Sequence, residues 1–178
     1  MPDTLSIIQR KALMSRIRAQ DTTPELVIRH ALWHQGFRYR VNDKRLPGKP
    51  DVVLPKYHTV VFVHGCFWHG HKDCKYYTVP ETNKEFWVAK VTRNQERDQE
   101  VWRKLEAKGW NVIIVWECQL KKANLDETID RVAAEIVRNG EIYRAAQEER
   151  KKAREEYRRE RKERKEREQA LLEEVKSL

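Results

Sequence analysis

The segment from Cys66 to Thr82 constrains this chain most strongly, because it is too irregular to be held by helix or sheet hydrogen bonds alone. It shows little periodicity, yet it concentrates cysteine, histidine and aromatic side chains. It follows a β-branched, apolar run over 59–63 that is typical of a buried strand. Side-chain interactions must therefore fix this segment against the rest of the fold.

Four possible metal ligands offer such an interaction. Cys66, His71 and Cys74 lie close together in the chain, and Cys118 follows an apolar run over 110–116. Zinc prefers four tetrahedral sulfur or nitrogen ligands, and four protein ligands leave no open position for catalysis. A sheet would bring the ends of the two apolar runs together, so we expect a structural zinc site. The alternative is that the cysteines are small buried residues.

Helical and strand patterns alternate along the first 140 residues. Strands are expected over 37–41, 51–54, 59–63 and 110–116, and helices over 4–19, 24–35, 83–108 and 125–138. The last helix is expected to end at Asn139-Gly140. This order predicts an α/β fold with a central mixed β-sheet flanked by helices. No apolar run is long enough to cross a membrane and no signal peptide is recognisable, so we expect a cytoplasmic protein.

The composition changes at about Tyr143. The rest of the chain contains no Gly or Pro, and its acids often precede bases by four residues, as in Glu163 and Arg167. This spacing favours an exposed helix, whereas the absence of an apolar heptad makes a coiled coil the weaker interpretation. We predict a domain over 1–142 and a charged helical extension over 143–178. The extension is either a solvated helix or a secondary arm for DNA or another partner.

The charge balance fits a polyanionic partner. The chain has 37 Lys and Arg against 28 Asp and Glu, for a formal net charge of +9. Lysine and arginine displace counterions from phosphates, although many basic proteins bind no nucleic acid.

Asp51 is a candidate ligand for a second, harder cation. It follows Pro50 at the start of an expected strand. Phosphodiester cleavage usually needs a cation that polarises the phosphate and activates water. Magnesium takes oxygen ligands and keeps several waters, so one or two protein oxygens suffice. Aspartates at strand starts are also common turn formers, so Asp51 alone does not decide the matter.

Histidines and aromatic residues flank the cysteine cluster. His64 and His69 could move a proton, and Asp98 on the expected helix could orient one of them. Phe67 and Trp68 are either core anchors or stacking platforms for bases.

Four collinear motifs resemble one known family. They are LPGKPDVVLPKY, VVFVHGCFWHGHKDC, EFWVAKVTRNQERD and GWNVIIVWEC, and the resemblance covers about residues 10–138. They closely resemble the very-short-patch repair (Vsr) endonucleases. The resemblance implies a restriction-endonuclease-like fold of the PD-(D/E)xK group. It also implies nicking of double-stranded DNA on the 5′ side of the thymine in a T:G mismatch, left by deamination of 5-methylcytosine.

The same resemblance implies a role for each matching residue. Asp51 and the carbonyl of Val63 would bind Mg²⁺, and Glu25 would complete the acidic site. His69 would act as general base supported by Asp98, and His64 would assist at the phosphate. The implied zinc ligands are Cys66, His71, Cys74 and Cys118. The implied DNA contacts are Phe67, Trp68, Trp87 and Lys49.

Some features leave alternatives open. Where the wider nuclease group has an acid-x-Lys, this chain has Phe62-Val63-His64, as the family does, and some members carry Thr in place of Val63. The expected partners are mismatched duplex DNA, a DNA cytosine methyltransferase by functional linkage, and mismatch-repair proteins; we expect a monomer acting at the nucleoid. The rivals are a restriction-like enzyme on matched duplex and a non-catalytic, zinc-stabilised DNA-binding module.

Overall fold

A computed structural model describes residue 9 and residues 20–176, with side chains described through residue 169. The helix predicted over 4–19 lies outside the described residues, apart from residue 9. The chain divides into two compact units, Met1–Asn139 and Gly140–Leu178, and each is described by itself. The domain boundary predicted at residue 142 stays a prediction.

The described elements follow the predicted order. They are α2 (Thr23–His34), β1 (Val52–Leu54), the 3₁₀ turn η1 (Pro55–Tyr57), β2 (Thr59–His64), α3 (Lys84–Glu106), β3 (Asn111–Trp116), the 3₁₀ turn η2 (Glu117–Leu120) and α4 (Leu125–Lys176). The predicted α/β fold with a mixed sheet and a long charged C-terminal helix is confirmed.

The sheet has the order β1-β2-β3. β1 is antiparallel to β2, and β3 is parallel to β2, with His64 opposite Trp116 in the register. Because β2 and β3 run in the same direction, the chain leaves both strands at the same edge of the sheet. This arrangement brings the segment after His64 beside the segment after Trp116.

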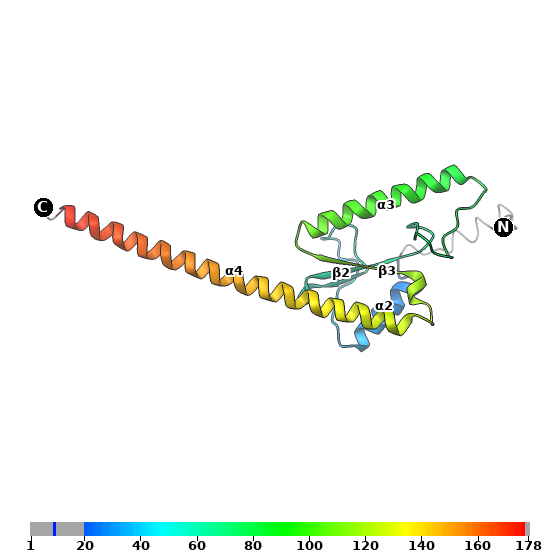
Figure 1. Cartoon of the computed structure of the whole chain (residues 1–178), viewed down its shortest axis with the longest axis horizontal. Helices are drawn as coiled ribbons and strands as arrows, with labels where there is room; N and C mark the ends of the chain where they lie inside the picture. The colour runs from blue at the N-terminus through cyan, green and yellow to red at the C-terminus, as the bar shows by residue number, and fades with distance from the viewer. Residues whose placement is uncertain (1–8, 10–19, 177–178) are drawn as a thin grey trace. The chain divides into compact units, whose positions relative to one another are not determined.

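Helices cover both faces of the sheet (Figure 1). On one face, α2 and the first turns of α4 pack through Ile28, Leu32 and Ile136 against Val61 and Val115, all fully or almost fully buried. On the other face, Leu105 of α3 packs on a smaller core; its other buried members are Val53, Val60 and Phe62. Alternate residues of β2 therefore face opposite cores, as the two-residue period of a strand requires.

The strand predicted over 37–41 is wrong. Only Arg40 forms a bridge, through two backbone hydrogen bonds of 2.8 Å with Val53. Phe37 instead buries its ring in the core, and the Tyr39 hydroxyl donates to the Arg29 carbonyl at 2.8 Å. Asn42 then adopts a positive φ of 49°, which ends the extended conformation.

The helix end predicted at Asn139-Gly140 is also wrong, because α4 continues to Lys176. A helical glycine costs about 1 kcal/mol relative to alanine. The following residues are mostly strong helix formers, and ion pairs such as Arg167 with Glu163 at 3.8 Å add small contributions. One unfavourable position therefore does not stop the helix. Among the described residues, no helix has the length and apolar character to span a membrane.

Leu32 and Leu26 test the packing of α2. Leu32 is fully buried, whereas Leu26 is 49% exposed. We expect Leu32→Ala to lower the free energy of unfolding by about 2–5 kcal/mol, because it leaves a cavity in the core. Leu26→Ala should change it by about 0.5 kcal/mol or less. Urea denaturation followed by circular dichroism measures both, and equal effects would contradict this packing.

Candidate active site and metal centre

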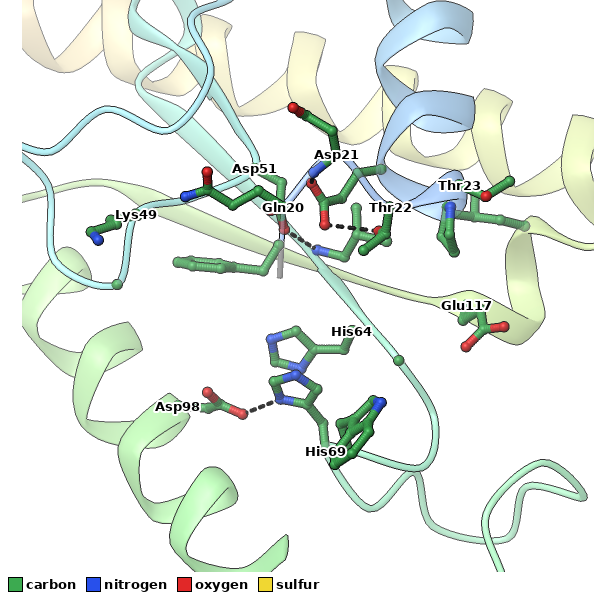
Figure 2. Close-up of a pocket in the computed structure, with 18 of the residues that line it drawn as sticks. Gln20, Asp21, Thr22, Thr23, Lys49, Asp51, His64, His69, Asp98 and Glu117 are labelled. Atoms are coloured by element: carbon green, nitrogen blue, oxygen red, sulfur yellow. Dashed lines mark hydrogen bonds and ion pairs between the residues drawn. The ribbon is translucent and has the colours of Figure 1, made fainter. Parts of the chain in front are cut away.

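An open cleft of about 1580 Å³ lies in the unit Met1–Asn139, between the start of α2, the sheet and α3 (Figure 2). It collects residues that are far apart in the sequence. The predicted site residues that line it are Glu25, Lys49, Asp51, Val63, His64, Trp68, His69 and Asp98. Lys49 is exposed there.

Asp51 is held at the start of β1 by backbone contacts. Its Oδ2 accepts a hydrogen bond from the Val63 N–H at 2.7 Å, and its carbonyl accepts one from Arg29 Nε at 3.1 Å. Burial, helped by the nearby charge of Glu25, raises the pKa of Asp51 to about 6. A cation beside this carboxylate would favour its ionised form. The donor chemistry therefore fits a hard cation held by oxygen.

Arg29 joins the start of α2 to β1. Its guanidinium pairs with Asp21 at 2.5 Å and with Glu25 at 3.1 Å, while its Nε bonds to the Asp51 carbonyl. Glu25 also accepts a hydrogen bond from the Thr22 hydroxyl at 2.8 Å. Arg29 was not identified from the sequence, although its spacing of four residues from Glu25 was the available signal.

His64 and His69 form a stacked pair with ring centroids 3.8 Å apart. His69 Nδ1 hydrogen-bonds to Asp98, so its Nε2 is the nitrogen left to exchange a proton. Burial lowers the pKa of His64 to about 3, which keeps this ring neutral. Its Nδ1 is buried and has no hydrogen-bond partner among the described residues.

Asp98 is suited to orient His69. Burial raises the pKa of Asp98, but the hydrogen bond and the charge of His69 outweigh burial and lower it below its usual value. Ligand atoms of His64, His69 and Asp98 lie within 4.8 Å of one another, so this trio could also hold a cation. The hydrogen bond between His69 and Asp98 would have to open for that, so proton transfer is the simpler use of the trio.

Polar side chains of α3 hold the loop that carries His69. Asn94 Nδ2 donates to the Trp68 carbonyl at 2.8 Å, and Gln95 Nε2 donates to the His69 carbonyl at 3.2 Å. Together with Asp98, they lie on one face of α3 at helical spacing. Neither Asn94 nor Gln95 was identified as a site residue from the sequence, because their partners are backbone atoms with no sequence signature.

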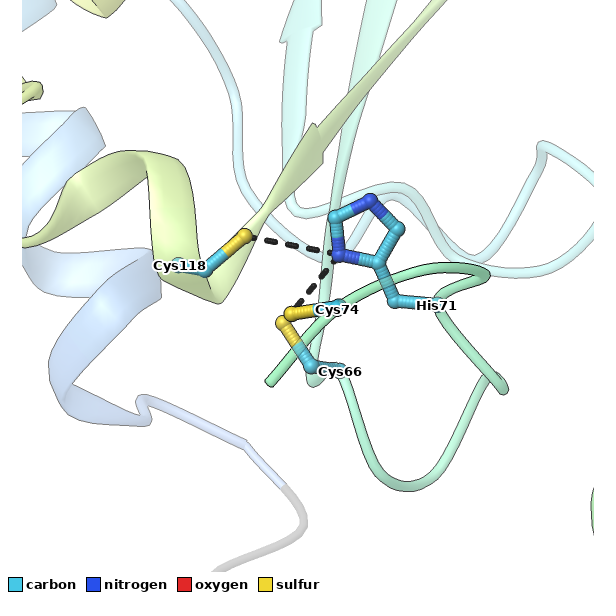
Figure 3. Close-up of side chains that lie close together, drawn as sticks. All are labelled: Cys66, His71, Cys74 and Cys118. Atoms are coloured by element: carbon cyan, nitrogen blue, oxygen red, sulfur yellow. Dashed lines mark hydrogen bonds between the residues drawn. The ribbon is translucent and has the colours of Figure 1, made fainter. Parts of the chain in front are cut away.

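The four predicted cysteine and histidine ligands converge (Figure 3). Their ligand atoms all lie within 4.8 Å of one another, and His71 Nδ1 is 3.5 Å from Cys66 Sγ and 3.4 Å from Cys118 Sγ. Burial raises the pKa of the Cys66 thiol to about 12. A metal cation would reverse this penalty, since it binds the thiolate. The Cys3His cluster could therefore hold a metal ion.

Aromatic side chains cluster beside the loop. Phe67 lies 5.2 Å from Trp68 and 5.3 Å from Trp87 between ring centroids. All three rings are partly exposed, and Phe86, 55% exposed, extends the cluster at 5.2 Å from Trp87. A cluster with exposed rings can stack on bases, which a fully buried one cannot.

Comparison with known proteins identifies the family. The family model for DNA mismatch endonuclease Vsr matches residues 2–76. The type II nicking enzyme V.NmeAIP of Neisseria meningitidis is 49% identical over 137 residues, covering 76% of this chain and 97% of the relative. The DNA mismatch endonuclease Vsr of Escherichia coli is 43% identical over 121 residues, covering 68% of this chain and 77% of the relative.

The chain belongs to the Vsr family. The resemblance seen in the sequence motifs is confirmed, and the chain is a DNA endonuclease. A further relative, the type II nicking enzyme V.XorIIP of Xanthomonas oryzae, is 43% identical over 120 residues, covering 67% of this chain and 88% of the relative. Membership of an endonuclease family argues against a non-catalytic DNA-binding module.

Gly70 tests whether the seating of the loop on α3 matters for Vsr-family catalysis. Gly70 has a φ of 63°, and a Cβ there would lie 2.5 Å from Gln95 Nε2 and 2.7 Å from Val91 Cγ1. We expect Gly70→Ala to displace His69 and lower the rate of DNA cleavage roughly 10- to 100-fold, because small misplacements of catalytic groups are costly. Single-turnover cleavage measures the effect.

Gly36 is the matched control. Its φ is 88°, but a Cβ there would meet no atom within 4 Å. Gly36→Ala should lower the free energy of unfolding by about 1 kcal/mol through backbone strain alone. The cleavage rate of the folded enzyme should stay unchanged. Full activity of Gly70→Ala would show that the loop does not need this close approach to α3.

Proposed function

We propose that this chain nicks duplex DNA on the 5′ side of the thymine in a T:G mismatch, by Mg²⁺-dependent hydrolysis. The observation that carries the proposal is a cleft in which the half-buried Asp51 carboxylate faces the pair His69–Asp98, beside partly exposed aromatic rings. The names of the relatives, as mismatch endonuclease and nicking enzymes, support the same reaction class.

Asp51 and the Val63 carbonyl are the proposed ligands of Mg²⁺, with Glu25 as a second acid of the site. When bound, the ion would polarise the scissile phosphate and lower the pKa of water. Asp51 is already fixed to Val63 by the 2.7 Å hydrogen bond, and Arg29 bonds to its carbonyl. These contacts preorganise the carboxylate, so little order has to be created on binding.

His69 is the proposed general base. Its Nδ1 faces Asp98, so Nε2 accepts a proton from the attacking water. The Asp98 carboxylate holds the ring in this orientation and stabilises the imidazolium that forms. His64, neutral and stacked on His69, is proposed to donate a hydrogen bond to the phosphate.

The aromatic cluster is the proposed reader of the mismatch. Phe67, Trp68 and Trp87 would enter the base stack, where a mispaired step costs less to open than a paired one. Lys49, exposed in the same cleft, would contact a phosphate.

The ion of the Cys3His cluster is proposed to be zinc in a structural role. Four protein ligands leave no position for a substrate. Such an ion would hold the loop over residues 66–74 against Cys118, which lies two residues after β3. That loop carries His69, so zinc would support catalysis by holding the base in place.

The remaining expectations follow from this reaction. We propose that the enzyme acts as a monomer inside the cell, in very short patch repair of deaminated 5-methylcytosine. A DNA cytosine methyltransferase would be its functional companion, because it creates the methylated base, and mismatch-repair proteins would act on the same lesions.

A labelled T:G duplex tests the reaction. We expect one nick next to the thymine that requires Mg²⁺, with much slower cleavage of the T:A duplex. Equal cleavage of both strands of the matched duplex would instead favour the restriction-like enzyme. Asp51→Asn should reduce cleavage by at least about 100-fold, because the amide cannot replace the negative charge.

Asp51→Asn should nevertheless fold as stably as the parent chain, since the raised pKa of Asp51 shows that the folded state disfavours its ionised form. Asp43→Asn is the matched control, because Asp43 lies outside the cleft and pairs with Arg45 at 2.5 Å. It should cleave at the parent rate. An Asp51→Asn enzyme with parent activity would overturn the assignment of Asp51.

Zinc removal tests the metal centre separately. Purified protein should contain one zinc per chain by elemental analysis, and Cys118→Ser should contain much less. We expect Cys118→Ser to unfold at a lower temperature, because the loop is no longer anchored to the end of β3. His34→Gln, an exposed histidine outside the cluster, is the control and should keep its zinc.

Chelation separates the two proposed ions. After removal of all metals, Mg²⁺ alone should fail to restore cleavage, whereas zinc followed by Mg²⁺ should restore it. Equal zinc content in the parent chain and in Cys118→Ser would refute the proposed zinc site.

A further inference from the structure

The part of α4 in the unit Gly140–Leu178 carries a line of cations on one face. We name Arg150, Arg154, Arg158, Arg161 and Lys165 the basic stripe. Their spacings of four, four, three and four residues place them within an arc of about 80°, over a length of about 22 Å. No other residue between 150 and 165 falls in that arc.

Between residues 148 and 166, the acids of this helix lie on the other side; Glu168, beyond the stripe, is in line with it. Seven glutamates occur between residues 148 and 166, and at about 100° per residue all of them fall in the opposite half of the helix. They are Glu148, Glu149, Glu155, Glu156, Glu160, Glu163 and Glu166. One face of this segment is therefore purely cationic, whereas the opposite half carries charges of both signs.

The ion pairs respect the same division. Lys151 pairs with Glu155 at 4.0 Å and Lys162 pairs with Glu166 at 3.6 Å, in both cases outside the stripe. All five stripe side chains are exposed, and none takes part in an ion pair found within the described part of the chain. Every ion pair described in this segment thus lies outside the stripe.

This arrangement is unfavourable for an isolated helix. Arg150 and Arg154 are four residues apart, as are Arg154 and Arg158, and as are Arg161 and Lys165. Like charges at this spacing destabilise a helix, whereas opposite charges at the same spacing would stabilise it. A polyanion on the stripe would remove this repulsion.

We propose that the basic stripe binds the phosphate backbone of duplex DNA, without reading its sequence. The enzyme acts on DNA, and a duplex carries about one phosphate charge per 1.7 Å of its axis, so the stripe length spans enough phosphates for all five cations. The inference depends on duplex DNA as substrate but not on the preference for T:G.

The match to V.NmeAIP covers almost all of that relative but not all of this chain. The V.NmeAIP match takes up 97% of that relative but only 76% of this chain. About a quarter of this chain therefore has no counterpart there, and added affinity for DNA from an extension would not alter the chemistry of the shared domain.

Two full-length variants with equal net charge test the proposal. In the stripe variant, Arg150, Arg154, Arg158, Arg161 and Lys165 are all replaced by Gln. In the control variant, cations of the other faces, Lys151, Lys152, Arg159, Lys162 and Arg167, are replaced by Gln. Far-ultraviolet circular dichroism shows whether both variants keep the helix content of the parent chain.

The readout is the dissociation constant for a matched duplex, longer than the stripe, across a series of salt concentrations. In a plot of the logarithm of the dissociation constant against the logarithm of the salt concentration, the slope should decrease by about 0.9 for each phosphate that the protein no longer neutralises. The decrease in the stripe variant should therefore reach up to about 4.5. The control variant should keep the parent slope. Single-turnover cleavage of the cognate substrate at saturating enzyme should be unchanged in both variants.

Two results would overturn the proposal. An equal decrease of the slope in both variants would mean that only the net charge of the helix matters. An unchanged slope in the stripe variant would mean that the stripe does not bind DNA, and an acidic protein would then be the alternative partner. Because binding is measured on matched DNA, a failure of T:G nicking would not affect this test, and a failure of the stripe would not affect the proposed reaction.

Discussion

Parallel pairing of β2 with β3 brings two chemically different segments to one edge of the sheet. The pair His64 and Trp116 is the last of the register, so the chain turns away from both strands at the same level. Cys66 follows two residues after the first strand and Cys118 two residues after the second. Three features depend on this single pairing: the Cys3His cluster, the loop that carries His69 and one wall of the cleft.

Burial then decides the chemistry of the groups at that edge. Asp51 is partly shielded from water beside Glu25, so its proton is held more tightly than usual, while the buried His64 loses its proton easily. Burial therefore reverses the usual order, in which a carboxyl group loses its proton at a lower pH than an imidazolium. Arg29 balances the acids at the start of α2, which allows three carboxyl groups to lie in this region with little mutual repulsion.

Local patterns were sufficient to predict the strands of the sheet and the convergence of the cysteines. β-Branched runs predicted β2 and β3, and the direction of a sheet explained why Cys118 should meet Cys66. The contacts of Asn94 and Gln95 with the loop, and of Arg29 with the Asp51 carbonyl, could not be predicted, since these partners are backbone carbonyls brought close only by the tertiary fold. Two errors, the strand over 37–41 and the helix end at Gly140, arose where side-chain packing or a long helical context outweighed a local signal.

Trp116 lies between the two halves of the site. Its ring stacks on His71 at 4.1 Å between centroids, and it meets His64 edge-on at 5.4 Å. One indole thus touches a member of the Cys3His cluster and a member of the candidate catalytic pair. A change of protonation or of metal binding at either imidazole would therefore alter the surroundings of the same indole.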